Sequence, residues 1–157
     1  MVTYNKEIES KLSKNRLGET EMINGVNHVT FAVRDLKESI KFYKDLLELR
    51  LVAHWDKGAY LLAGNMWIAL NVDKTTRTEP SSDYSHIAFN VLSIDYPKLK
   101  ERLIKAGVET FKENSSEGDS FYFLDPNGHK LELHYNTLED RLEWAKKNDW
   151  QTFSINE

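Results

Sequence analysis

The chain of 157 residues contains no cysteine and no excess of basic residues. The absence of cysteine excludes a disulfide scaffold, a cysteine-ligated zinc site and a cysteine nucleophile, so any thiol chemistry must use a thiol carried by a small molecule. With 21 basic and 25 acidic residues, the formal net charge is −4. This balance argues against a nucleic-acid-binding function, because phosphate backbones are held by a surplus of lysine and arginine.

Long apolar runs are also missing, since no run approaches the ~18 residues of a membrane span. Residues 1–21 are polar and lack the apolar stretch of a secretory signal, so we expect a cytoplasmic protein that binds neither nucleic acid nor membrane. These residues are expected to form a helical or disordered extension. A single domain is expected over 22–150, and a tail over 151–157.

Two stretches of the chain follow the same pattern. Residues 27–49 and 85–108 each begin with a polar residue and a histidine, alternate with period two, and then change to helical spacing. Asp35 and Ser93 are expected to cap the two helices. The apolar faces of these helices are expected to consist of Leu36, Ile40, Tyr43 and Leu47 in the first helix and Tyr96, Leu99, Leu103 and Ala106 in the second.

Short strands with turn signals between them are expected after each helix. Their expected ranges are 49–55, 58–64 and 66–72, then 109–114, 119–125 and 129–135, with a hairpin turn at 125–128. Each half is therefore a βαβββ module: module 1 covers about 24–73 and module 2 about 84–136, joined by a polar linker. A C-terminal helix is expected over about 137–147, capped by Thr137. The predicted fold class is α+β, with two paired βαβββ modules.

The repeat places His28 and His86 at equivalent positions, and Glu132 lies in the middle of an apolar strand of module 2. A buried carboxylate needs a partner, and two imidazoles with one carboxylate form a site for a divalent first-row metal. The position of module 1 that matches Glu132 is Ala69, which leaves a coordination position free for substrate. Alternatively, Glu132 faces solvent on an edge strand and the two histidines are structural. His54, His129 and His134 have no repeat partner and are expected to be surface or packing residues.

The stretch 112–123 is rich in small residues with side-chain oxygens. It could surround a hard cation or form an anion nest, or it could be a solvated hairpin loop. Lys112 before this loop and Arg141 on the C-terminal helix are candidate ligands for a phosphate or phosphonate, although either could be a plain surface charge.

Five segments together resemble a known family: NHVTFAV (27–33), WDKGAYL (55–61), DYSHIAF (83–89), SEGDSFYFLDPNGHKLE (116–132) and TLEDRL (137–142). They are similar to the fosfomycin-resistance proteins of the glyoxalase, or vicinal-oxygen-chelate, superfamily, and most of all to the glutathione-dependent, manganese-containing transferases. The resemblance covers about residues 22–145. It implies a domain-swapped homodimer with shared active sites, which adds the glutathione thiol to the epoxide of fosfomycin and thereby confers antibiotic resistance.

The resemblance also implies roles for particular residues. Mn(II) would be held by His28 of one subunit and by His86 and Glu132 of the other. The implied catalytic residues are Thr30, Lys112, Tyr122 and Arg141. The implied substrate-binding residues are Thr30, Tyr60, Trp67, Tyr84, Lys112, Ser116, Ser120, Tyr122 and Arg141. An activating K⁺ ion would be held by the loop residues Asn114, Ser116, Glu117, Gly118 and Ser120.

Other activities of the same scaffold remain as alternatives: another thiol donor (bacillithiol or cysteine), water, or drug binding without a metal. The hydrolase branch carries a glutamate base where this chain has Gly58, and without a carboxylate there is no base at that position to activate water. The bacillithiol-dependent branch lacks the SEGDS loop that this chain has. A glyoxalase-type isomerase would need a further carboxylate, and Ala69 removes the obvious candidate. An Fe(II) dioxygenase would use the same ligands, but it would not need a phosphonate pocket.

Overall fold

The computed structural model describes residues 23, 25–115, 118–148 and 150–155. Over these residues it contains two four-stranded sheets of the same design. In module 1 the strand order is β1 (His28–Val33), β4 (Met66–Val72), β3 (Gly58–Ala63) and β2 (Arg50–Trp55). In module 2 it is β5 (Ile87–Asn90), β8 (Lys130–His134), β7 (Ser120–Leu124) and β6 (Thr110–Lys112). The expected extension 1–21 and the candidate residues Ser116 and Glu117 lie outside the described residues.

The two sheets repeat each other in pairing and in register. The first strand of each module runs parallel to the last, and the other pairs are antiparallel. Thr30 pairs with Ala69 in module 1, and Ala88 pairs with Glu132 in module 2. The predicted βαβββ repeat and the α+β fold class are confirmed, and Ala69 occupies the position that Glu132 has in the other module.

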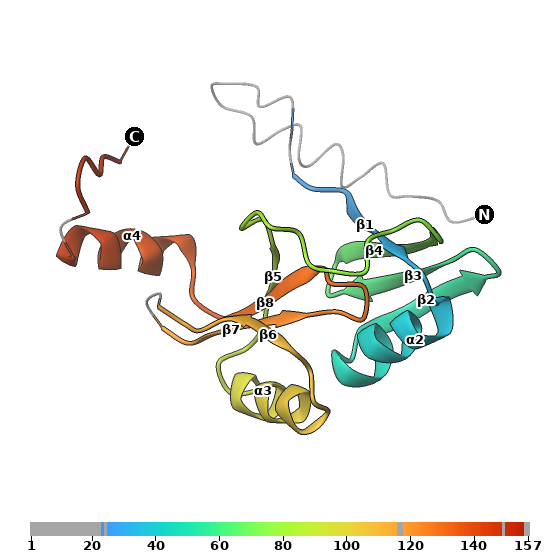
Figure 1. Cartoon of the computed structure of the whole chain (residues 1–157). Helices are drawn as coiled ribbons and strands as arrows, with labels where there is room; N and C mark the ends of the chain where they lie inside the picture. The colour runs from blue at the N-terminus through green and yellow to red at the C-terminus, as the bar shows by residue number, and fades with distance from the viewer. Residues whose placement is uncertain (1–22, 24, 116–117, 149, 156–157) are drawn as a thin grey trace, which may run out of the picture.

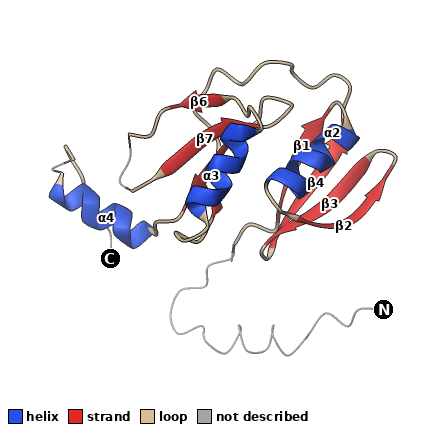
Figure 2. Ribbon diagram, turned by 90° about the horizontal axis from the view of Figure 1, so that it is seen from below, coloured by secondary structure: helices blue, strands red, loops and turns tan. Residues whose placement is uncertain are grey.

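The helices cover one side of both sheets, as the two views in Figures 1 and 2 show. In module 1, α2 (Leu36–Lys41) continues into the π-helical turn η1 (Phe42–Leu46), and in module 2 the helix is α3 (Tyr96–Lys105). Asp35 caps α2 as predicted, because its carboxylate accepts a hydrogen bond from the Glu38 N–H at 2.9 Å.

The prediction of Ser93 as the cap of the second helix is wrong, because Asp95 occupies that position. The N–H groups of Asp95 and Tyr96 both donate to the carbonyl of Leu92, so residues 92–95 form a turn before the helix begins. Pro97 in the first turn fits this later start, since proline is compatible with the first helical residues and with few other helix positions.

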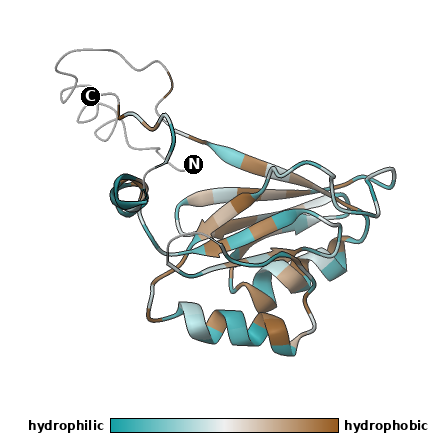
Figure 3. Ribbon diagram, turned by 60° about the vertical axis from the view of Figure 1, so that its left-hand side comes forward, coloured by the Kyte–Doolittle hydropathy of each residue, from teal (hydrophilic) through white to brown (hydrophobic). Residues whose placement is uncertain are grey.

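The core lies between the helices and the sheets. Its fully buried apolar side chains include Val33, Tyr43, Leu61, Ile68, Leu70, Leu103, Phe123, Leu131 and Leu133. Burial of one such side chain contributes roughly 1.5–3 kcal/mol. Ala106 was predicted on the apolar face of the second helix. It lies outside the core, because it is the exposed C-cap of α3. Along the strands, hydrophobic and hydrophilic residues alternate (Figure 3), so the face of each sheet that is turned away from the helices is more polar.

A further helix, α4 (Leu138–Lys147), leads away from the sheet of module 2 (Figure 1). It begins at a reciprocal capping box, in which the Thr137 hydroxyl accepts from the Asp140 N–H and the Asp140 carboxylate accepts from the Thr137 N–H. This confirms the predicted start of the C-terminal helix. Within the described part of the chain, no helix has the length and apolar character needed to cross a membrane.

Candidate functional site

Residues predicted for the site form rows across the face of the module 1 sheet that is turned away from the helices. Thr30 pairs with Ala69, which pairs in turn with Tyr60, and His28 pairs with Trp67. Because alternate residues of a strand share a face, all five side chains project from the same side. His28 and Thr30 are exposed there, whereas Phe31 and Val33 of the same strand are buried. Module 1 therefore presents an imidazole, a hydroxyl and two aromatic rings together.

A second row crosses the module 2 sheet. Ala88 pairs with Glu132, Glu132 with Tyr122, and Tyr122 with Lys112, so one carboxylate, one phenol and one ammonium lie side by side on adjacent strands. Glu132 lies on β8, which is an interior strand, and only 6% of it is exposed. The alternative of a solvent-facing glutamate on an edge strand is thereby excluded.

The buried carboxylate of Glu132 meets the imidazole of His86, with Oε2 at 2.8 Å from Nε2. The other ring nitrogen, Nδ1, lies 3.0 Å from the Tyr84 carbonyl and must donate to it, because a carbonyl can only accept. A neutral ring then presents its Nε2 lone pair to the carboxylate, and two acceptors at this distance need a proton or a metal cation between them. The pair thus has the donor atoms and the orientation of two metal ligands, with the Tyr84 carbonyl supporting the histidine from behind.

The loop before β5 is held in place by hydrogen bonds that fix Tyr84 and His86. The Asp83 carboxylate accepts from Ser81 and from the Ser85 N–H, and these bonds lower the pKa of Asp83 to about 2. Lys130 donates to the Asp83 carbonyl. The loop that carries two site residues is therefore tied both to itself and to the start of β8.

The Lys112 ammonium lies against two tyrosine side chains. It donates to the Tyr84 hydroxyl at 2.6 Å and lies 4.6 Å and 4.8 Å from the ring centroids of Tyr84 and Tyr122. The hydrogen bond to Tyr84 raises the pKa of Lys112 against the opposing effect of burial, so the group stays charged. The Tyr122 ring also lies 5.8 Å from that of His86. One positive charge and two phenols next to the His86–Glu132 pair suit an anionic oxygen compound.

His134 contributes to this site although the sequence assigned it to the surface or to packing. Its Nδ1 lies 3.4 Å from Oε1 of Glu132 and 2.8 Å from the Ser120 hydroxyl. It therefore contacts the carboxylate oxygen that His86 leaves free. The signal was present in the period-two alternation of β8, because Lys130, Glu132 and His134 share one face, but the lack of a repeat partner hid it.

The loop after Lys112 is described in part. Asn114 donates its side-chain amide to the Gly118 carbonyl at 2.8 Å. Gly118 has φ +64°, and a Cβ there would lie 2.0 Å from the Asn136 amide nitrogen, so glycine is required. Ser120 is buried against His134. Potassium binding by this loop stays a prediction, and two of its five candidates, Ser116 and Glu117, lie outside the described residues.

Arg141 lies on α4, with its guanidinium 5.0 Å from the ring centroid of Trp150 and 5.9 Å from that of Trp144. This helix extends away from the module 2 sheet in Figure 1. The predicted role of Arg141 as a phosphonate ligand stays a prediction.

The candidate ligands on module 1 (His28) and on module 2 (His86 and Glu132), called the two half-sites below, form no common cluster within the described residues of one chain. His28 donates from Nδ1 to the Asn27 amide oxygen at 2.8 Å, and its ring lies against that of Trp67, tilted by 33° with centroids 4.4 Å apart. His86 and Glu132 contact each other in module 2. Among the described residues, no cluster of three or more His, Asp or Glu side chains is arranged to hold a metal ion. Within one chain, the candidate metal ligands therefore lie in two separate groups, one on each module.

Two βαβββ modules, one bearing a histidine and the other a histidine–glutamate pair, define a protein of the glyoxalase class. The chain belongs to the Glyoxalase/Bleomycin resistance protein/Dioxygenase superfamily, whose pattern it matches over residues 25–133. Within that superfamily it groups with FosA, FosB and FosX. It is 50% identical to Glutathione transferase FosA of Serratia marcescens over 131 residues, covering 82% of this chain and 93% of that protein.

Two further relatives place the chain in the same group. It is 43% identical to Metallothiol transferase FosB of Staphylococcus epidermidis over 128 residues, covering 79% of this chain and 90% of that protein. A crystal structure of a FosX variant from Listeria monocytogenes, complexed with Mn(II) and 1S,2S-dihydroxypropylphosphonic acid, superimposes with a TM-score of 0.67 at 30% identity. That comparison covers 78% of this chain and 99% of the FosX chain.

Gly58, at the start of β3, has no room for a side chain. A Cβ there would lie 2.5 Å from the Trp55 ring and 2.7 Å from the Leu70 carbonyl oxygen. We expect Gly58→Ala to lower the free energy of unfolding by roughly 1–3 kcal/mol through overpacking. Gly64→Ala, where φ is +58° but nothing lies within 4 Å of the added Cβ, is the control for backbone strain alone. Urea unfolding of both variants tests this, and an unchanged free energy of unfolding in Gly58→Ala would contradict it.

Proposed function

We propose that this protein is a Mn(II)-dependent glutathione transferase that opens the epoxide of fosfomycin and so confers resistance to the drug. The observation that supports the proposal is the row of Glu132, Tyr122 and Lys112 next to His86. In this row, two candidate metal ligands lie near an ammonium group that could bind a phosphonate. The family membership and the 50% identity to a glutathione transferase support the same activity.

The residues fit the metal. Two imidazoles and one carboxylate form a donor set that suits a divalent first-row ion and leaves coordination positions for substrate oxygens. His28 of one subunit would complete the pair formed by His86 and Glu132 of the other, and Ala69 leaves the fourth position open. When bound, Mn(II) would supply a Lewis acid that withdraws charge from the epoxide oxygen as the ring opens.

The chain's own side chains would position the two reactants. Thr30 projects beside His28 and can donate its hydroxyl to the epoxide oxygen. Lys112 and Arg141 would neutralise the phosphonate, and Tyr122 would donate a hydrogen bond to it. The glutathione sulfur attacks the less hindered epoxide carbon, the carbon–oxygen bond breaks, and the released oxygen takes up the proton lost by the thiol. Ring strain favours the reaction, so positioning and charge stabilisation are what the protein contributes. Trp67 and Tyr84 would form walls of the pocket, and Tyr60 lies where the thiol would enter.

Addition of water is the runner-up, because solved relatives of the FosX type share the fold. A glutamate base at position 58 would meet Trp55 and the Leu70 carbonyl, which disfavours this alternative. Thiol transfer is therefore preferred to hydrolysis.

A matrix of thiols and metals tests the proposal. Purified protein is incubated with fosfomycin and with glutathione, bacillithiol, cysteine or no thiol, each with Mn(II), Mg(II), Zn(II), Fe(II) or Ni(II), and the drug is followed by phosphorus NMR. We expect the fastest loss with glutathione and Mn(II), and faster loss in K⁺ than in Na⁺. Equal opening of the epoxide without any thiol would show that the protein is a hydrolase.

A further inference from the structure

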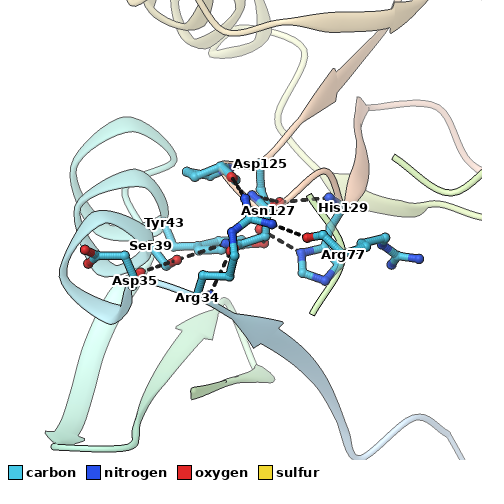
Figure 4. A network of polar contacts seen from close by, with 9 residues as sticks. Arg34, Asp35, Ser39, Tyr43, Arg77, Asp125, Asn127 and His129 are labelled. Carbon is cyan, nitrogen blue, oxygen red and sulfur yellow. Dashed lines mark hydrogen bonds and ion pairs between the residues drawn. The ribbon is translucent and has the colours of Figure 1, made fainter. Parts of the chain in front are cut away.

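The turn between β7 and β8 is built into module 1, although both strands belong to module 2. Asn127 lies in this turn with 2% of its surface exposed. Its side-chain oxygen accepts from the Arg34 N–H at 2.9 Å, and its amide nitrogen donates to the Ser39 hydroxyl at 3.1 Å (Figure 4). Both the oxygen and the nitrogen of this buried amide form hydrogen bonds with module 1, so the amide holds the two modules in one orientation.

Asp125 forms the second part of this contact between the modules. We call the contact the joint and define it by six residues: Arg34, Ser39, Tyr43, Asp125, Asn127 and His129. The Oδ2 atom of Asp125 accepts from the Tyr43 hydroxyl and from His129 Nδ1, both at 2.9 Å, and its Oδ1 accepts from two backbone N–H groups of the turn. Burial alone would raise the pKa of Asp125, but the hydrogen bond and charge of His129 hold it below its ordinary value. Burial and the Asp125 charge raise the pKa of Tyr43 well above 10, so Tyr43 stays a neutral donor.

The joint lies directly between the strands that carry the two half-sites. Arg34 follows the last residue of β1, the strand of His28 and Thr30, and the His129 ring packs on Phe31 of that strand with centroids 4.9 Å apart. On the other side, His129 immediately precedes β8, the strand of Glu132. The joint therefore contacts β1 on one side and leads directly into β8 on the other.

We propose that Tyr43 and Asn127 are positioning residues, which set the angle between the modules at which two half-sites from different subunits can close on a metal. This rests on the proposed function and its shared sites. In a two-fold dimer, both sites depend on the same angle, because module 1 of each chain must meet module 2 of the other. Metal ligands must lie within about 0.2 Å of their ideal distances, so a small change of angle weakens binding at both sites.

Tyr43→Phe tests the proposal, because it removes one hydrogen bond of the joint and keeps the ring that packs in the core. We expect the Mn(II) dissociation constant to rise about tenfold, as when a supporting hydrogen bond of a ligand is lost. Titrations followed by electron paramagnetic resonance are run on folded dimer, at protein concentrations where sedimentation shows no monomer. The rate at saturating Mn(II) should recover most of the wild-type value.

Tyr96→Phe is the matched control. Tyr96 is also a buried tyrosine, 3% exposed, but it lies on α3 and its hydroxyl has no hydrogen-bond partner within the described residues. The Tyr96→Phe variant should bind Mn(II) with the wild-type dissociation constant. Should Tyr43→Phe fail to fold, Ser39→Ala removes the partner of Asn127 from the same joint and is expected to weaken Mn(II) binding in the same direction.

The possible outcomes distinguish a failure of this proposal from a failure of the proposed function on which it rests. Wild-type protein that neither binds Mn(II) nor consumes fosfomycin with glutathione would overturn the proposed function. If the wild type is active and the Mn(II) dissociation constant of Tyr43→Phe lies within twofold of that of Tyr96→Phe, the positioning role is wrong. A lower melting temperature with unchanged metal affinity would mean that the joint only stabilises the fold.

Discussion

Replacement of Glu132 by glutamine is expected to abolish the consumption of fosfomycin, by at least about 1000-fold, in a protein that remains folded. Glutamine keeps the shape of the side chain and removes the charge that faces His86 Nε2 at 2.8 Å. Without that charge, the proposed ligand set would lose its one anionic donor, and Lewis-acid assistance worth several kcal/mol would be lost with the metal. We also expect Mn(II) affinity to fall by more than the ~10–100-fold that loss of a supporting hydrogen bond costs.

The measurements are turnover of the drug with glutathione, Mn(II) binding by titration calorimetry, and urea unfolding. Glu101→Gln is the matched control, since it makes the same change at an exposed carboxylate that pairs with Lys105 on α3. It should leave all three quantities unchanged. Retention of even a tenth of the wild-type rate by Glu132→Gln would remove Glu132 from the metal site.

Much of the site could be predicted from the sequence because it follows from a repeat. Once His28 and His86 are equivalent, strand pairing places Glu132 opposite Ala88 and Ala69 opposite Thr30, and both relations hold in the structure. Period-two alternation then sets which residues share a face. Lys112 and Tyr122 lie beside Glu132 because of the register of two strand pairs, β6–β7 and β7–β8. The length of the turns and the choice of buried face determine such a register.

Other features could not be predicted because a local explanation was already sufficient. The segment 125–128 has the chemistry of a hairpin turn, and nothing in its sequence shows that Asn127 also bonds to Arg34 and Ser39 some ninety positions earlier. His129 has no repeat partner, yet it is buried against Asp125. The position of Arg141 depends on where α4 points after its cap, and helix periodicity carries no information about that direction.

Two inactive variants are expected to restore activity when they are combined in one dimer. If each site takes His28 from one subunit and His86 with Glu132 from the other, a heterodimer of His28→Ala and Glu132→Gln has one site with both defects and one with none. The site without defects combines module 2 of the His28→Ala chain with module 1 of the Glu132→Gln chain. The purified heterodimer should therefore retain about half of the wild-type turnover, while each homodimer has essentially none.

Co-expression of the two chains with different affinity tags, followed by tandem purification, isolates the heterodimer. Its Mn(II) stoichiometry should be one tightly bound ion per dimer, against two in the wild type. The separate placement of His28 and of the His86–Glu132 pair within the described chain is the structural reason for this expectation. Recovery must come from subunit sharing, because a site confined to one chain would carry a defect in both subunits and the heterodimer would be as inactive as its parents.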